Sequence, residues 1–295
     1  MKILVTGTSG ILGSAICEFL SEKGIDVESF NRSGFFNQSP DEHFHLLEDF
    51  DYIIHAAANT NVEGCEVNPR ECYKDNTLFT ERLAIASSKS NCKFIYISST
   101  GIYGTGNTTE PYTEFDSVKP TTHHHHSKWL GECAVNRYCA SALILRTGWL
   151  FGGPPESEKN FVARRIEEAI KTKHRCIFSN NTQIGVPTSV YDFVSKLYEL
   201  LLNAETGTFN LVNTNTASRF EYVSKIIELA EVDVKVEPVT ASSFKRKANV
   251  SNNETAISLK LSMLGYSDLP CWSDSLESYI KDGLKEWIMR LKNGQ

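Results

Sequence analysis

Short apolar runs alternate with amphipathic stretches through the first half of the chain. Strand-like runs occupy residues 2–7, 26–32, 51–58, 93–100 and 142–148, and helical spacing of apolar residues occupies 12–24, 68–89 and 123–139. Strands that alternate with helices at this spacing pair in parallel through right-handed crossovers. The pattern therefore predicts a doubly wound parallel α/β sheet, and the fully apolar strands indicate that helices cover both of its faces.

The pattern becomes irregular after residue 150. Helical stretches are expected at 161–172, 190–203 and 218–231, a short strand at 208–212, and a plain amphipathic helix at 273–293. We expect a first domain over residues 1–150, to which later segments return, and a smaller lobe over residues 151–295.

Composition excludes several classes of protein. The formal net charge is −6 and the pI about 5.8. The chain therefore lacks the net positive charge that attracts nucleic acid or anionic lipid. No run approaches the roughly 18 apolar residues of a membrane span. The eight cysteines are scattered without a CxxC pair, which is typical of reduced thiols. Because the chain begins directly on a strand, without a leader, we expect a cytoplasmic protein.

Three glycines follow the first strand in "VTGTSGILG", at Gly7, Gly10 and Gly13. Glycines between a strand and a helix allow a tight turn and close approach of a pyrophosphate to the helix N-terminus. This context favours a dinucleotide cofactor over a bare turn. The residues expected to contact it here are Gly7, Ser9, Gly10, Ile11, Leu12 and Gly13.

The second strand ends at Asn31 and Arg32. A carboxylate at this position would accept a hydrogen bond from the ribose 2′-hydroxyl of NAD(H), whereas a guanidinium suits a 2′-phosphate. We therefore expect NADP(H) to be favoured over NAD(H), although an arginine that stacks on adenine or faces solvent would give the same pattern.

Several segments, in order along the whole chain, resemble the extended short-chain dehydrogenase/reductases, and most closely the dTDP-4-dehydrorhamnose reductase subgroup. They include "IIHAAANT", "ISSTGIYG", "PYTEFDSVKPTTHHHHSKWLGE", "LILRTGWLFGG" and "TQIGVPTSVYDF". The resemblance implies a Rossmann-type domain with a C-terminal substrate lobe. It also places Ala56, Ala57 and Ala58 against the cofactor.

The resemblance implies a catalytic set with one replacement. In this family a Tyr-x-x-x-Lys pair on a helix acts with a Ser or Thr on the preceding strand. Carried over, the lysine is Lys128, which also binds the nicotinamide ribose, and the hydroxyl residue is Ser99. The position of the tyrosine is occupied by His124, within a run of four consecutive histidines.

Three interpretations of His124 remain open. It donates the proton in place of the tyrosine, because imidazole titrates near neutrality. Alternatively the chain binds nucleotide without turnover, as the related regulatory subunit of methionine adenosyltransferase does, or another group donates the proton and His124 only shapes the pocket. A metal site is disfavoured, because only His123 and His126 of the run share a helix face.

The substrate side is predicted from the same resemblance. Candidate contacts are Asn59, Thr100, Trp149, Asn160 and Gln183, and the usual aspartate and tyrosine after the catalytic hydroxyl are replaced by Thr100 and Gly101. The implied function is NAD(P)H-dependent reduction of a nucleotide-diphospho 4-keto-6-deoxy sugar. The alternatives are a nucleotide-sugar epimerase or dehydratase and a non-catalytic NADP-binding regulatory protein. We also expect no metal and a possible homodimer.

Overall fold

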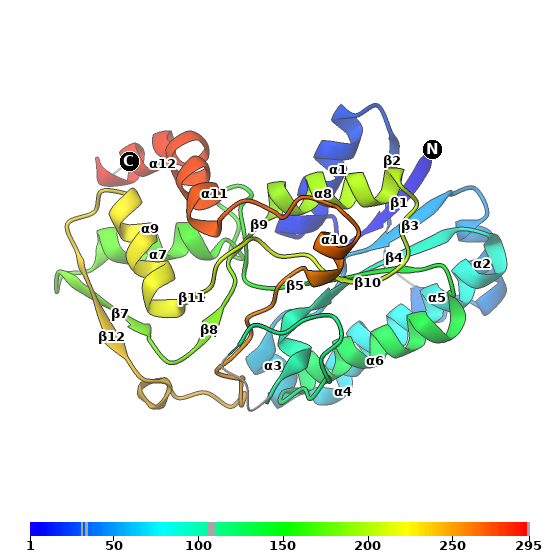
Figure 1. The fold of residues 1–295 in the computed structure, drawn as a ribbon, viewed down its shortest axis with the longest axis horizontal. Coiled ribbons are helices and arrows are strands. Elements are labelled where there is room, and N and C mark those ends of the chain that lie inside the picture. The colour runs from blue at the N-terminus through cyan, green and yellow to red at the C-terminus, as the bar shows by residue number, and fades with distance from the viewer. Residues whose placement is uncertain (31, 33–34, 106–109, 294–295) are drawn as a thin grey trace.

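A six-stranded sheet runs through the larger half of the molecule. The computed structural model describes residues 1–30, 32, 35–105 and 110–293, and its sheet has the order β10-β5-β4-β3-β1-β2 with every neighbouring pair parallel (Figure 1). The strands are β1 (Lys2–Thr6), β2 (Asp26–Ser29), β3 (Tyr52–His55), β4 (Lys93–Ser99), β5 (Leu143–Thr147) and β10 (Gly207–Asn210). The predicted doubly wound sheet is confirmed, and its switch point lies between β1 and β3, where ligands bind in such sheets.

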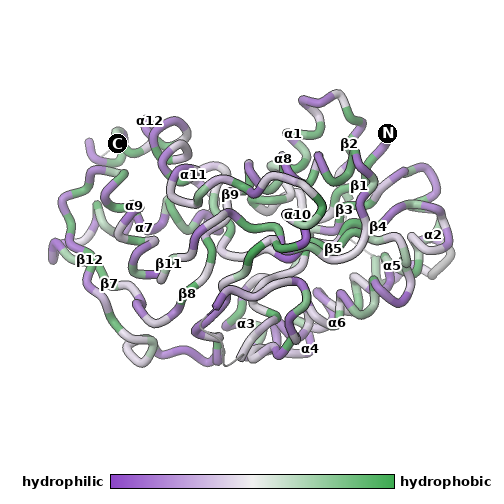
Figure 2. Tube along the Cα trace, in the orientation of Figure 1, coloured by the Kyte–Doolittle hydropathy of each residue, from purple (hydrophilic) through white to green (hydrophobic). Residues whose placement is uncertain are grey.

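Helices cover both faces of this sheet. One face carries α1 (Ile11–Glu22) and α8 (Val190–Leu202), and the other carries α2 (Pro40–Leu47), α5 (Phe79–Ser90) and α6 (His123–Tyr138). The core between the layers is aliphatic on the first face and rich in aromatic rings on the second. In Figure 2 the strands form an apolar band between helices of mixed polarity. Among the described residues, the helices are too short or too polar to cross a bilayer.

The lobe has its own apolar core. It is built from α7 (Phe161–Lys171), α9 (Arg219–Leu229), α11 (Trp272–Ser278), α12 (Lys285–Lys292) and the parallel pair β7 (Cys176–Asn180) and β12 (Lys235–Val239). Shorter pairs, β6 (Leu150–Phe151) with β9 (Thr188–Ser189) and β8 (Ile184–Gly185) with β11 (Ala217–Ser218), join it to the sheet domain. Because β10 is a strand of the large sheet and α8 packs on one face of it, the second half of the chain is shared between both parts (Figure 1).

Two predicted helices are interrupted. The stretch expected as one helix at 68–89 consists of α4 (Pro69–Tyr73), a π-helical turn at Lys74–Leu78, and α5, and a separate short helix, α3 (Val62–Val67), precedes it. The C-terminal stretch likewise contains a π-helical turn at Tyr279–Gly283. Such turns commonly occur at functional sites. The first one carries Asp75, which lines the cavity described below, and Asn76, which hydrogen-bonds to the backbone of Asn59.

A buried ion pair supports the sheet beneath the carboxyl ends of its strands. Arg146 on β5 donates to Glu132 on α6, with Nη2 2.8 Å from Oε2 and Nε 3.0 Å from Oε1. Its Nη1 donates to the hydroxyl of Tyr103 at 2.9 Å, and that hydroxyl donates to Oδ1 of Asn210 on β10 at 2.7 Å. All four side chains are buried, so the network connects β5, α6, β10 and the 3-10 turn Thr100–Tyr103 in the interior.

Candidate functional site

A cavity of about 1530 Å³ lies between the carboxyl edge of the sheet and the lobe. The glycine loop, the ends of β3, β4 and β5, the start of α6 and several lobe segments line it. A pocket for one drug-sized ligand occupies roughly 300–1,000 Å³. The space is therefore sufficient for a dinucleotide and a second ligand together.

The glycine loop fits a dinucleotide for steric reasons. Gly7 has a φ of +75°, and a Cβ on it would lie 2.7 Å from the backbone nitrogen of Ala57, while a Cβ on Gly13 would lie 2.2 Å from the oxygen of Gly7. No side chain caps α1 at Gly10, so its first N–H groups remain available to a phosphate. The predicted cofactor contacts on this side all line the cavity: Gly7, Ser9, Gly10, Ile11, Leu12, Gly13, Ala56, Ala57 and Ala58.

Arg32 also lines the cavity, next to an unexpected partner. Its guanidinium forms an ion pair with Asp75 of the π-helical turn and lies over the rings of Phe36 and Phe79, at 5.6 and 4.9 Å from their centroids. The cation is thus held in place before any ligand arrives. Asn31, the other residue expected here, lies outside the described part of the chain.

His124 is buried in the cavity wall, at 7% exposure. Its Nδ1 lies 2.9 Å from the backbone oxygen of Asn59, and because a carbonyl oxygen can only accept, the ring hydrogen belongs on Nδ1. Nε2 has no partner among the described residues and is left as the acceptor. Burial, with lesser repulsion from His125 and Lys128, lowers the pKa of His124 to about 3.

Asn76 in the π-helical turn fixes this arrangement. Its Oδ1 accepts from the N–H of Asn59 at 2.7 Å, and its Nδ2 donates to the oxygen of Asn59 at 3.1 Å and to Ser127 Oγ at 2.9 Å. The Ser127 hydroxyl donates to the backbone oxygen of His124 at 2.7 Å. Asn59, predicted as a substrate contact, does not itself line the cavity. Its backbone instead orients the His124 ring.

Lys128 and Ser99 complete this end of the cavity. Lys128 is buried without a carboxylate partner among the described residues, its Nζ 4.1 Å from the ring centroid of Tyr96. Burial lowers its pKa to about 7. Ser99 Oγ accepts from the N–H of Gly101 at 3.2 Å, which leaves its own hydrogen free. The predicted catalytic residues therefore line one cavity together with Thr100.

The other histidines of the run have separate environments. His123 and His126 face outward on one side of α6, and the Nδ1 atom of each contacts the hydroxyl of Tyr73, at 3.0 and 2.7 Å. His125 is buried and lines the cavity. Within the described ranges, no cluster of three or more His, Cys, Asp or Glu side chains is arranged to hold a metal.

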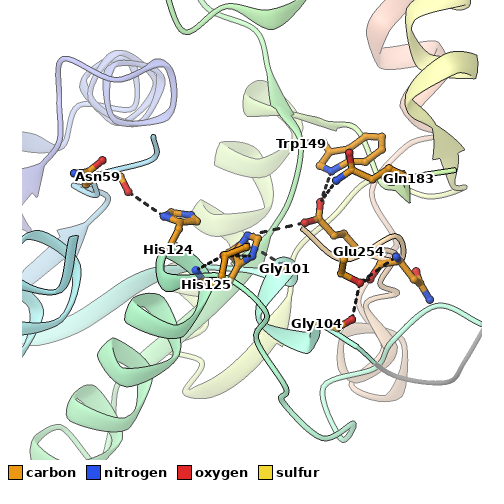
Figure 3. A network of polar contacts seen from close by, with 12 residues as sticks. Asn59, Gly101, Gly104, His124, His125, Trp149, Gln183 and Glu254 are labelled. Carbon is orange, nitrogen blue, oxygen red and sulfur yellow. Dashed lines mark hydrogen bonds and ion pairs between the residues drawn. The ribbon is translucent and has the colours of Figure 1, made fainter. Parts of the chain in front are cut away.

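A buried carboxylate that we did not predict organises the substrate side. Glu254 Oε2 accepts from Trp149 Nε1 at 2.7 Å and from Gln183 Nε2 at 3.4 Å, and all three residues line the cavity (Figure 3). The guanidinium of Arg219 lies 3.4 Å above the Trp149 ring. Trp149 and Gln183 are thus in the expected place, whereas the segment around Glu254 has no periodicity or motif that would have revealed it.

Asn160 does not belong to the cavity, contrary to our expectation. It is fully buried and caps α7, with Oδ1 accepting from the N–H of Ala163 at 3.1 Å. Its Nδ2 donates to the oxygens of Gly153 and Pro154 and lies 2.6 Å from the hydroxyl of Tyr279. Both polar atoms of the Asn160 amide form hydrogen bonds within the protein, so the role of this side chain is structural.

A strap (residues 241–250) passes from the lobe to the sheet domain, and several of its residues line the cavity (Figure 1). Among the described residues its hydrogen bonds to α3 end on the Glu63 carboxylate, which accepts from Arg246 Nε and Lys247 N at 2.8 Å and from Ala248 N at 3.2 Å. These donors lower the pKa of Glu63, with the Arg246 hydrogen bond as the largest cause. Sequence reasoning missed this segment because its composition resembles an ordinary polar loop.

The chain is similar to proteins of known sequence and structure along nearly its full length. A family model described as RmlD substrate binding domain matches residues 1–284. The spore coat polysaccharide biosynthesis protein SpsK of Bacillus subtilis is 27% identical over 83% of this chain and 85% of its own. A dTDP-4-dehydrorhamnose reductase of Mycobacterium tuberculosis H37Rv is 27% identical over 93% and 91%. The crystal structure of dTDP-4-dehydrorhamnose reductase from Bacillus anthracis in complex with NADP superposes with a TM-score of 0.88, 28% identity and coverage of 96% and 100%.

Proposed function

Because the chain belongs to the RmlD substrate binding domain family, we propose that this NAD(P)-dependent oxidoreductase reduces a nucleotide-diphospho 4-keto-6-deoxy sugar with NADPH. One observation carries the proposal: a glycine loop shaped for a dinucleotide and the His124–Lys128 pair line the same cavity, which has room for a second ligand. The full-length relatives named dTDP-4-dehydrorhamnose reductase make a dTDP-linked sugar the first substrate to try.

The preference for NADP(H) over NAD(H) rests on Arg32. Its guanidinium lines the cavity beyond the end of β2, and the described residues there, Ser29 and Phe30, offer no carboxylate for a ribose hydroxyl. Asp75 competes with a 2′-phosphate for the same cation, so we expect a moderate preference. The relative from B. anthracis was crystallised with NADP.

The bound cofactor supplies hydride to the substrate carbon, and the protein must supply a proton to the oxygen. With a pKa of about 3, His124 would be protonated in about one molecule in 10⁴ at pH 7, which costs about 5 kcal/mol. Lys128, with a pKa of about 7, is protonated in a large fraction of molecules. We therefore assign the proton to Lys128.

His124 and Ser99 then act on the oxygen that receives this proton. The free hydrogen of Ser99 donates to the substrate oxygen while charge develops there. Nε2 of His124 accepts a hydrogen bond from the oxygen once it is a hydroxyl. Of the three interpretations of His124, this is the one in which another group donates the proton.

The alternatives predict different chemistry. A nucleotide-sugar epimerase or dehydratase would return the cofactor unchanged, and a regulatory protein would bind NADPH without oxidising it. The relatives reported above include named reductases and no regulatory protein, which favours the reductase. Homodimer formation and a cytoplasmic location remain predictions.

The decisive assay mixes the protein with NADPH and a panel of dTDP-, UDP- and GDP-linked 4-keto-6-deoxy sugars. Loss of NADPH absorbance with at least one sugar, and one alcohol formed per NADPH consumed, is the expected result. Flat absorbance across the panel, with tight NADPH binding retained, would establish the regulatory alternative instead.

A further inference from the structure

His125 and Glu254 present two unused polar atoms to each other in the cavity wall. Nε2 of His125 lies 4.0 Å from Oε1 of Glu254, and both side chains are more than nine-tenths buried (Figure 3). This separation is too long for a hydrogen bond, yet an oxygen about 2.8 Å from each atom fits between them. Neither atom hydrogen-bonds to another group within the described residues.

The neighbours of His125 determine what its Nε2 offers. Thr122 Oγ1 accepts the backbone N–H of His125 at 3.2 Å, so its own hydrogen is free for Nδ1 of the ring, 3.1 Å away. Burial lowers the pKa of His125 to about 4, so the ring is neutral at pH 7. With the Thr122 hydroxyl donating to Nδ1, we assign the single ring hydrogen to Nε2, which is then a donor.

Glu254 supplies the matching acceptor. Its Oε2 already accepts from Trp149 and Gln183, which leaves Oε1 for a ligand. The group that fits is a hydroxyl, because it can accept from Nε2–H and donate to Oε1 at the same time. A carbonyl oxygen or a CH₂ group can satisfy at most one of the two atoms.

Both sides of this pair are held rigidly. Glu254 N donates to the oxygen of Ile184 at 2.9 Å, and Ile184 N donates to the oxygen of Asn252 at 2.7 Å. The His125 ring lies against Gly101, where a Cβ would approach Nε2 to 2.2 Å. Any side chain at residue 101 would displace the imidazole, so the glycine and the histidine fit only together.

The position of the pair identifies the hydroxyl. The rings of His124 and His125 have centroids 5.0 Å apart, and on this basis we place the hydroxyl held by His125 on a carbon next to the one that reacts beside His124. On a 4-keto-6-deoxy sugar the two neighbours of the reacting carbon are C3, which carries a hydroxyl, and C5, which carries a methyl group. Only C3 offers the group that the pair requires.

We propose that His125 and Glu254 form a hydroxyl clamp, in which both residues hydrogen-bond to the 3-hydroxyl of the sugar. The clamp would select 3-hydroxy over 3-deoxy substrates. The inference rests on the proposed function for the identity of the ligand, and it adds a specificity site to it. A site built to bind a hydroxyl rejects the analogue without it, because its buried polar atoms are left unpaired.

Calorimetric titration with dTDP-6-deoxyglucose and its 3-deoxy analogue tests the clamp without requiring turnover. The native protein is expected to bind the 3-hydroxy compound about 10- to 100-fold more tightly. His125→Phe, which keeps a ring, and Glu254→Gln should each abolish most of this ratio while NADPH affinity and Tm are retained. His126→Phe, one residue on but facing Tyr73 at the surface, is the matched control and should leave the ratio unchanged.

The outcomes separate the two proposals. Equal affinity of the native protein for both compounds, or an equal loss for both in the variants, would overturn the clamp. A protein that shows the ratio but oxidises no NADPH with any 4-keto sugar would overturn the proposed function and leave the clamp in place. Failure of the native protein to bind either sugar nucleotide would overturn both.

Discussion

Nδ1 of His124 lies 2.9 Å from the backbone oxygen of Asn59, and this contact decides which nitrogen of the ring faces the cavity. The nitrogen that remains, Nε2, can accept a hydrogen bond but has no proton to give in the neutral ring. A histidine at the position of the family's tyrosine therefore does not simply replace it as an acid. We therefore propose that the proton comes from Lys128, which is buried one turn further along the same helix face.

Replacing His124 with tyrosine is expected to raise kcat of the reduction at alkaline pH, by about tenfold or more. A phenol beside Lys128 would restore a group that still carries its proton when Lys128 has lost its own. Steady-state rates at several pH values measure the effect, with His126→Tyr as the surface control. A drop in kcat at every pH would show that the imidazole has a role which a phenol cannot fill.

Arg32→Ala is expected to weaken NADPH binding about tenfold or more and to leave NADH nearly unchanged, since only NADPH carries the 2′-phosphate. Asp75→Asn should act in the opposite direction, because it releases the guanidinium from its ion pair. Fluorescence titration with both cofactors gives the ratio. Parallel losses for NADPH and NADH in Arg32→Ala would remove the basis for the cofactor preference.

Glu63→Ala is expected to free the strap, because all three of its hydrogen bonds to α3 end on this carboxylate. Trypsin should then cut after Lys245, Arg246 or Lys247 at least about tenfold faster, since cleavage follows the population of the open segment. The KM for the sugar nucleotide should rise. Glu66→Ala, on the same helix, is the comparison variant, and equal cleavage of the two would contradict this account of the strap.

Glu132→Gln should lower the free energy of unfolding by about 3–5 kcal/mol, because it leaves the buried cation of Arg146 without its counter-charge. Glu277→Gln removes the exposed Lys281–Glu277 pair and should change the free energy of unfolding far less, because solvent screens these charges. Urea denaturation of the two variants provides the comparison. Similar losses would mean that the buried pair contributes no more than a solvated one.

The sheet could be predicted from sequence because its central early strands β1, β3 and β4 are short apolar runs between stretches of helical spacing. The glycine loop was found from its short motif, whereas Ser99, His124 and Lys128 came from the family resemblance, and the structure brings them to one cavity. The break at residues 74–78 was missed because a π-helical turn shifts the apolar pattern of a helix by one residue, which is too small a change to recognise in a mainly polar stretch.

The substrate side was less predictable because it is assembled from segments far apart in the chain. Glu254 meets Trp149 across about a hundred residues of sequence, and nothing local marks a glutamate in a polar loop as buried. Asn160 was predicted as a substrate contact, but it caps α7 and does not line the cavity. It looked like a ligand-binding amide, whereas a polar residue before a helix commonly serves as its cap.

The pH dependence of kcat/KM for sugar reduction tests the central claim most directly. If Lys128 supplies the proton, its protonated form is present below a pKa of about 7 and is lost above it, so kcat/KM should be level at acid pH and fall about tenfold per pH unit above about 7. Lys128→Arg keeps the charge but cannot release a proton, so it should lower kcat/KM at every pH as well as remove the alkaline limb. A rate that instead rises about tenfold per unit as the pH falls from 7 towards 4 would contradict the account and make His124 the acid.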